Sequence, residues 1–174
     1  MANIFLFTGE VQSGRTSHME KLVEQLRLRG KKLCGFLSYG EGGRERTGFT
    51  LVDLESGERV QLALKQNIDG WLPQGRFHFN PEALTRGRMI LERAKKNRET
   101  ILVVDEVGPL ELDGKGWGPC LDELAGDHRG LQLWVSRNRI MERVMDRWNI
   151  PQERVMNMDP ELLDEQLKKL ERYE

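Results

Sequence analysis

The sequence is poor in cysteine. Its 174 residues include only Cys34 and Cys120, which stand far apart and form none of the spacings typical of metal or redox motifs. This argues against a disulfide framework and against a metal–thiolate site. We therefore expect two reduced thiols and a cytoplasmic protein.

Long apolar runs and an excess of one charge are also missing. The longest apolar runs, such as Ile101–Val104, have the length of a strand and fall far short of a bilayer span. Residues Met1–Phe7 lack a basic region, so they predict a first strand and not a signal peptide. With 27 basic and 28 acidic residues the net charge is −1. We expect neither a membrane partner nor a nucleic-acid partner.

The chain alternates short apolar runs, rich in β-branched and aromatic residues, with segments of helical period. The predicted strands are Ile4–Phe7, Leu33–Leu37, Ile101–Val104, Leu131–Val135 and Val155–Met156. Apolar stripes predict helices over Met19–Leu26, Ile140–Trp148 and Leu163–Leu170. Asp159 and Pro160 form a capping pair before the last helix. This alternation predicts an α/β fold with a mostly parallel sheet covered by helices on both faces.

One segment departs from the alternation. Thr47–Leu54 and Glu58–Leu64 flank a Ser-Gly turn and predict a β-hairpin, inserted at about residues 36–64. The stretch after it predicts a loop with one short strand, Arg76–Phe79. We see no linker or internal repeat, and we expect one domain over residues 1–174 and a monomer.

Residues 9–17 carry a phosphate-binding motif. They read Gly-Glu-Val-Gln-Ser-Gly-Arg-Thr-Ser, which is G-x-x-x-x-G-K-[ST] with arginine in place of lysine. The glycines let successive backbone N–H groups turn toward phosphates, and the following helix presents its positive N-terminus to them. The motif follows the strand Ile4–Phe7 and opens the helix at Met19–Leu26, which is the context it requires. That context favours a phosphate site over a glycine-rich turn without a ligand.

The predicted ligands are a nucleoside triphosphate, ATP or GTP, and Mg²⁺. Arg15 takes the role of the cation that reaches the β- and γ-phosphates, and the Thr16 hydroxyl that of a Mg²⁺ ligand. The predicted binding residues are Gly9, Glu10, Val11, Gln12, Ser13, Gly14, Arg15, Thr16 and Ser17.

The apolar strand Ile101–Val104 ends in two carboxylates, Asp105 and Glu106. Beside a phosphate loop such an aspartate holds Mg²⁺, usually through water, and the adjacent glutamate can act as general base on the attacking water. The alternative is a strand that merely stops at charged residues, and the upstream phosphate loop favours the functional interpretation. The following Gly-Pro pair forces a turn, after which Glu111 faces either the site or solvent.

Four stretches occur in order over about residues 4–112: the phosphate loop, Gly35–Phe49, Gly75–Asn80 and Asp105–Leu112. The last reads Asp-Glu-Val-Gly-Pro-Leu-Glu-Leu. It resembles the characteristic Asp-Glu-Ile-Gly-x-Met-Glu-Leu of the small nucleoside-triphosphatases typified by the human cancer-related enzyme and its thermophile relatives. Gly35–Phe49 and Gly75–Asn80 resemble that family's Gly-Phe…Arg-x-Gly-Phe hairpin and its Gly-x-Tyr/Phe segment.

The resemblance implies a three-layer P-loop NTPase fold and slow, Mg²⁺-dependent hydrolysis of nucleoside triphosphates to diphosphates with broad base tolerance. The chain departs from the family pattern at Arg15 and in the stretch Ser38–Gly43. The roles that the resemblance implies fall on Gly9, Gly14, Arg15, Thr16, Asp105 and Glu106.

The function depends on whether Arg15 can take over the role of the lysine in the motif. Arginine keeps the positive charge and can fork onto phosphate oxygens, but it is planar and larger than lysine. Displacing a catalytic cation by about 1 Å can cost on the order of 10²-fold in rate. A working NTPase, a nucleotide-binding protein with little or no turnover, and a nucleotide-dependent transferase such as a kinase all remain open.

Other polar residues are weaker candidates. Arg137 and Arg139 follow a predicted strand and either reach a γ-phosphate as an arginine finger or lie in solvent at a helix start. Arg44 and Arg46 on the hairpin arm form either a substrate lid or a solvated surface. Asn157, after the last strand, is a candidate contact of the base.

Overall fold

The computed structural model describes residues 3–9, 15–127 and 130–173. In these ranges it has one nine-stranded sheet in the order β5-β6-β4-β3-β2-β7-β8-β1-β9. The strands are β1 (Asn3–Gly9), β2 (Leu33–Glu41), β3 (Gly48–Asp53), β4 (Arg59–Leu64), β5 (Leu72–Gln74), β6 (Phe77–Phe79), β7 (Ile101–Val104), β8 (Leu131–Arg137) and β9 (Val155–Asn157).

Helices connect most of these strands. The α-helices are α1 (Arg15–Leu28), α2 (Pro81–Lys96), α3 (Pro109–Leu112), α4 (Gly118–Ala125), α5 (Met141–Trp148) and α6 (Leu163–Glu171). Short 3-10 turns are η1 (Asn138–Ile140), η2 (Gln152–Arg154) and η3 (Pro160–Leu162). None of the helices in the described ranges is long and apolar enough to cross a membrane.

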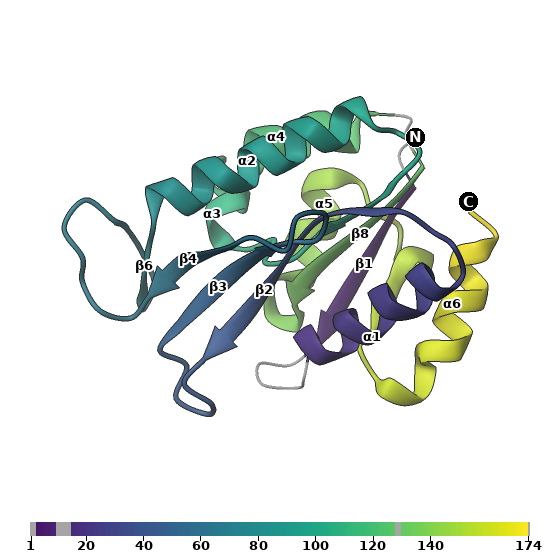
Figure 1. Ribbon diagram of the computed structural model, residues 1–174, viewed down its shortest axis with the longest axis horizontal. Helices are drawn as coiled ribbons and strands as arrows, with labels where there is room; N and C mark the ends of the chain where they lie inside the picture. Colours follow the sequence, from purple (N-terminus) through teal and green to yellow (C-terminus); the bar gives the residue numbers. More distant parts are fainter. Residues whose placement is uncertain (1–2, 10–14, 128–129, 174) are drawn as a thin grey trace.

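The parallel half of the sheet consists of β2, β7, β8, β1 and β9, the strands predicted from the apolar runs. Parallel neighbours need crossover connections, so helices cover both faces. α1 and α6 pack on the face that carries Phe5 and Phe7. α2, α4 and α5 pack on the face that carries Leu6 and Val104. Figure 1 shows α2 and α4 on one side of the sheet and α1 and α6 on the other, so the three-layer α/β prediction is confirmed.

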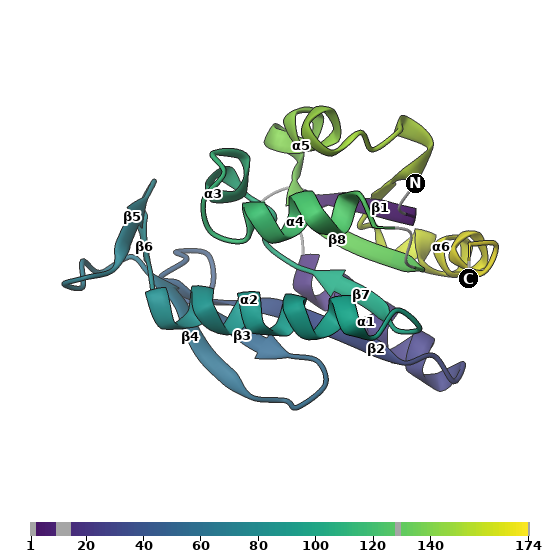
Figure 2. The same ribbon diagram turned by 90° about the horizontal axis from the view of Figure 1, so that it is seen from above.

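The antiparallel half extends the sheet beyond β2. β2 pairs with β3, and β3 with β4 around the predicted turn, so the hairpin is confirmed. The next stretch differs from the prediction, because β5 and β6 form a second hairpin that pairs with β4. Gly75, with φ 59°, stands in the two-residue connection, where a tight hairpin turn needs a positive φ. Figure 2 shows β5 and β6 projecting at the end of the molecule farthest from α6.

Two helix starts use the same pair of residue types. Asn80 accepts a hydrogen bond from the Glu82 amide at 3.1 Å and precedes Pro81 in α2, a helix that we did not predict from periodicity. Asp159 accepts one from the Glu161 amide at 3.0 Å, and η3 intervenes before α6. An Asx–Pro pair therefore marks both starts, because the side chain binds a free amide and proline needs none.

Gly35 sets the contact between β2 and β7. Its φ is 102°, a left-handed value that side chains rarely adopt. A Cβ at this position would lie 1.9 Å from the carbonyl oxygen of Val103 on β7. The close pairing of β2 with β7 therefore requires a glycine at position 35.

We expect Gly35→Ala to lower the free energy of unfolding by about 3 kcal/mol or more, since backbone strain and overpacking add. Gly57→Ala is the matched control. Gly57 has a positive φ of 76° but no atom within 4 Å of the added Cβ, so the expected loss is about 1 kcal/mol. Urea unfolding of both variants measures the difference, and equal losses would contradict the steric role of Gly35.

Candidate active site

Three parallel strands meet at the edge of the sheet that carries the predicted site residues. Gly9, the last residue of β1, pairs with Arg137, the last residue of β8. On its other side β8 pairs with β7, with Val104 opposite Trp134. The ends of β1 and β7 therefore lie on either side of β8, about 10 Å apart at the usual strand spacing. This edge brings Gly9, Asp105 and Glu106 into one region.

Part of the predicted phosphate loop lies outside the described residues, namely Glu10, Val11, Gln12, Ser13 and Gly14. Arg15 and Thr16 are described as the first residues of α1, without their side chains. Ser17 lies exposed in the first turn of that helix. The predicted contacts of these residues with phosphate and Mg²⁺ stay predictions.

Asp105 is a buried carboxylate that links the end of β7 to the neighbouring strand β2. It is 3% exposed. Its Oδ2 accepts a hydrogen bond from the Ser38 amide of β2, and its Oδ1 one from the Glu106 amide, each at 2.9 Å. These two hydrogen bonds fix the orientation of the carboxylate.

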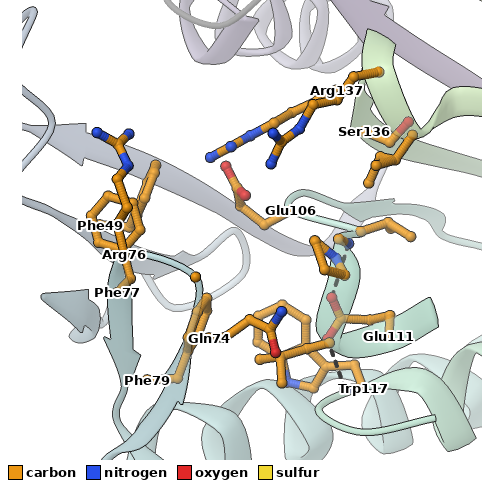
Figure 3. Close-up of a pocket in the computed structure, with 17 residues that line it drawn as sticks. Phe49, Gln74, Arg76, Phe77, Phe79, Glu106, Glu111, Trp117, Ser136 and Arg137 are labelled. Carbon is orange, nitrogen blue, oxygen red and sulfur yellow. Dashed lines mark hydrogen bonds between the residues drawn. The ribbon is translucent and has the colours of Figure 1, made fainter. Parts of the chain in front are cut away.

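Glu106 directly follows Asp105 in an unusual backbone conformation. Its φ is 63°, a left-handed value that is uncommon outside glycine and clusters at functional sites. The next residue returns to the sheet, since the Val107 amide donates to the Val135 carbonyl oxygen at 2.9 Å. Between these two anchors the Glu106 side chain lines a cavity at the strand ends (Figure 3).

Glu111 organises the loop that follows. It is 3% exposed. Its Oε1 accepts from the Gly108 amide at 2.9 Å and its Oε2 from the Trp117 amide at 3.2 Å. The sequence left open whether Glu111 faces the site or solvent, and the structure excludes solvent. Glu111 connects the two ends of its own loop beside the cavity. Gly116 makes room for it, because a Cβ there would lie 2.2 Å from Oε2.

The environment of Glu111 changes its acidity. Burial raises its pKa from the ordinary 4.5 to about 7. The hydrogen bonds from the Gly108 and Trp117 amides oppose this by stabilising the charged form, and the charge of Glu106 raises the pKa further. Glu111 thus changes its charge in the neutral range.

The cavity beside Glu106 has a volume of about 370 Å³. Its apolar wall includes four aromatic side chains: Phe49 of β3, Phe77 and Phe79 of β6, and Trp117 before α4. Phe49 and Phe77 meet edge to face with ring centroids 5.2 Å apart. Polar side chains complete the lining, namely Gln74, Arg76, Glu106, Glu111, Ser136, Arg137 and Arg139.

The other candidates separate into groups. Arg137 and Arg139 both line the cavity, which keeps them near Glu106. Arg46 packs on its own hairpin, with its guanidinium 5.7 Å from the Phe49 ring centroid and in the space above Gly40. Asn157 lies exposed on β9, on the far side of β1 from the cavity.

Sequence reasoning missed the aromatic wall and Ser136. Phe77 and Phe79 alternate with a polar residue, which predicted a strand but not its neighbours. Phe49, Phe77 and Trp117 come from three separate segments that only the antiparallel extension and the Glu111 loop bring together. Ser136 had a readable signal, because it ends a strand of a parallel sheet, where ligands bind.

We expect the stability of the protein to fall as pH rises from about 4.5 to 7 through Glu111. The pKa of Glu111 in the folded protein, about 7, exceeds its ordinary value of 4.5. The protonated side chain therefore stabilises the fold fully below pH 4.5, and this stabilisation is lost as the pH rises through 7. The loss is on the order of 3 kcal/mol. Urea unfolding across this range should show a shallower pH slope for Glu111→Gln than for the wild type. The exposed Glu99→Gln is the control, and an unchanged slope in Glu111→Gln would contradict the assignment.

The chain is similar to proteins of known class. A family model described as NTPase matches residues 3–166. The nucleoside-triphosphatase THEP1 of Ignicoccus hospitalis is 37% identical over 108 residues, 60% of this chain and 58% of that relative. That alignment spans less than two thirds of the relative's length. The THEP1 of Methanopyrus kandleri is 34% identical over 131 residues, 74% of this chain and 70% of the relative.

Solved structures agree with these matches. The crystal structure of THEP1 from the hyperthermophile Aquifex aeolicus has a TM-score of 0.76 at 26% identity, covering 97% of this chain and 99% of that one. The solution structure of a human cancer-related nucleoside triphosphatase has a TM-score of 0.73 at 21% identity, covering 98% of each chain, and shows the fold alone. The resemblance inferred from the motifs is confirmed. Since the family model spans nearly the whole chain, the protein belongs to the NTPase family.

Proposed function

We propose that the protein hydrolyses nucleoside triphosphates to diphosphates with Mg²⁺, and that Glu106 is the general base. The observation that carries the proposal is the conformation of Glu106. It follows the buried Asp105 at a φ of 63° and lines the cavity at the strand ends, one strand away from the end of β1, where the predicted phosphate loop begins. A carboxylate held there suits the activation of water beside a bound phosphate.

Phosphate binding falls to residues 9–17. Backbone amides of a glycine-rich loop and the N-terminus of α1, a helix of 14 residues, favour the negative charge of phosphates. Arg15 adds a guanidinium that can bind two phosphate oxygens at once. The carboxylates of Asp105 and Glu106, which follow β7 on the other side of β8, would then face the terminal phosphate.

Asp105 and Thr16 are the residues that would hold Mg²⁺. The Asp105 carboxylate is buried beside the strand ends and is held in place by two backbone amides, and a carboxylate in such a position can hold Mg²⁺ through water. Within the described ranges no three His, Cys, Asp or Glu side chains gather into a metal-binding group. Such a cage is not required, because Mg²⁺ in nucleotide sites relies on one or two protein ligands, waters and phosphates. When bound, the ion neutralises charge that develops on the phosphates.

The chemistry at Glu106 is a proton transfer coupled to phosphoryl transfer. A water proton moves to the Glu106 carboxylate while the water oxygen bonds to the terminal phosphorus. The bond between that phosphorus and its bridging oxygen breaks, and the diphosphate leaves. Arg137 lines the same cavity and supplies positive charge near the terminal phosphate.

Two alternatives predict different products. A nucleotide-binding protein that Arg15 renders inactive would bind nucleoside triphosphates tightly and release no phosphate. A transferase would consume them only when an acceptor is present. The cavity beside Glu106 favours the transferase over the inactive protein, because it leaves space for a molecule larger than water.

We expect Glu106→Gln to retain nucleoside-triphosphate binding and to lose about 10²–10⁴-fold in turnover, because the amide cannot accept the proton. Phosphate release and calorimetric binding with Mg²⁺ measure the two effects. Glu99→Gln, exposed at the opposite end of β7, is the control and should match the wild type. Equal turnover in Glu106→Gln and the control would remove Glu106 from the mechanism.

We expect Arg15→Ala to weaken nucleoside-triphosphate binding by about 10²-fold, in line with the loss of a charge-assisted bidentate contact. Arg15→Lys restores a cation, so its affinity should stay within about tenfold of the wild type. Titration of both variants with a non-hydrolysable analogue and Mg²⁺ tests this. Wild-type affinity in Arg15→Ala would show that the guanidinium does not contact the phosphates.

A further inference from the structure

The cavity beside Glu106 lies on the opposite face of the sheet from α1, the helix that follows the predicted phosphate loop. Its walls include Phe49, Phe77, Trp117 and Ile140, which belong to the core on the face covered by α2, α4 and α5. α1 packs on the opposite face. In a triphosphate the base and the terminal phosphate lie at opposite ends. If the terminal phosphate faces Glu106, the base points away from the cavity, and the cavity stays open to a second molecule.

The aromatic walls determine what shape of molecule fits. The hollow of about 370 Å³ has aromatic side chains on its inner wall and the exposed Arg76 and Arg139 at its opening. Its volume lies in the range of small-molecule sites. Phe49 and Phe77 meet at an interplanar angle of 64° and offer ring surfaces at the wall. Flat aromatic rings stack favourably on such surfaces.

Positive charge determines the second property of the ligand. Arg76 is exposed on the β5–β6 turn, with its guanidinium 5.6 Å from the centroid of the Phe77 ring. Arg139 is exposed on the other wall, after β8. Figure 3 shows Arg76 and Arg137 on opposite sides of the hollow with Glu106 between them. Arginines on both rims suit a carboxylate or phosphate group.

Two uncharged polar residues, Ser136 and Gln74, line the cavity. The Ser136 hydroxyl is fully buried and has no hydrogen-bond partner among the described residues. Gln74 extends from β5 into the hollow (Figure 3) and presents an amide, which both donates and accepts. The Gln74 amide can therefore bind both a donor and an acceptor on the edge of a ring, whereas the Ser136 hydroxyl lies behind the surface of the cavity.

We propose that this cavity is a binding site for a second ligand, a nitrogen-containing aromatic ring that carries an anionic group, as in a nucleoside 5′-monophosphate. The ring lies against Phe49 and Phe77, Gln74 binds its polar edge, and Arg76 binds the anion. This site is distinct from the site of the nucleoside triphosphate. The inference rests on the proposed function, because it requires the triphosphate to be bound at the phosphate loop.

The test is calorimetric titration of the full chain, first with a non-hydrolysable ATP analogue and Mg²⁺ and then, at saturation, with AMP, GMP, CMP and UMP. Filling the phosphate loop first prevents the probe from binding there. Ribose 5-phosphate lacks the ring and adenosine lacks the anion, so each serves as a ligand control. Arg76→Ala removes the proposed anion contact, and Arg59→Ala is its matched control. Arg59 also stacks on an aromatic ring, 5.4 Å from the Tyr39 centroid, but lies outside the cavity.

We expect at least one monophosphate to bind, with one-to-one stoichiometry, to the protein already saturated with the ATP analogue. Its affinity should fall at least about tenfold in Arg76→Ala and stay unchanged in Arg59→Ala. Both ligand controls should bind at least tenfold more weakly than that monophosphate.

The proposal is overturned if no monophosphate binds the filled protein, if Arg76→Ala binds as tightly as the wild type, or if ribose 5-phosphate binds as tightly as the monophosphate. Failure of the ATP analogue itself to bind would instead overturn the proposed function. The two failures are therefore distinguishable.

Discussion

The buried carboxylate of Asp105 holds the edge of the sheet together at the point where the chemistry is proposed. Its two oxygens accept hydrogen bonds from the amides of Ser38 and Glu106, so one side chain connects β2 to the turn after β7. Hydrogen bonds to a charged group are stronger than neutral ones, and each of these contributes on the order of 1.5–3 kcal/mol. The left-handed conformation of Glu106 depends on this anchor, since a non-glycine residue adopts it only where its surroundings impose it.

Strand order explains how a single edge serves several roles. β8 lies between β1 and β7, which separates the predicted phosphate loop from the carboxylates by one strand. The termini of β8 and η1 then contribute Ser136, Arg137 and Arg139 to the space between them. Beyond β7, the loop held by Glu111 carries Trp117 to the cavity. The antiparallel extension brings Phe49 and Phe77 from the other side.

The parts of this arrangement that follow from local chemistry could be predicted from the sequence. Apolar runs predicted the parallel strands, because a strand buried on both faces needs them. The phosphate loop and Asp105-Glu106 were visible as motifs with a known chemical reason for each residue type. The Ser-Gly turn predicted the hairpin of β3 and β4, because glycine at φ 76° closes it.

The remaining features depend on contacts between distant segments. The position of Glu111 follows from two amides, one of them six residues away, and from the absence of a side chain at Gly116. Phe49 and Phe77 meet only because β6 pairs with β4 beside β3, a choice that periodicity does not reveal. The conformation of Glu106 is set by Asp105 and by the Val107–Val135 bond. Such features arise from packing and register, which one sequence does not disclose.

The central claim is that a nucleoside triphosphate binds at the edge between β1 and β7 with its terminal phosphate toward Glu106. The most direct measurement is a crystal structure of the protein with a non-hydrolysable triphosphate and Mg²⁺. We predict the phosphates at the N-terminus of α1, the terminal phosphate beside Glu106, and the base away from the cavity lined by Phe49 and Phe77. A base stacked inside that cavity, or phosphates bound away from α1, would contradict the account.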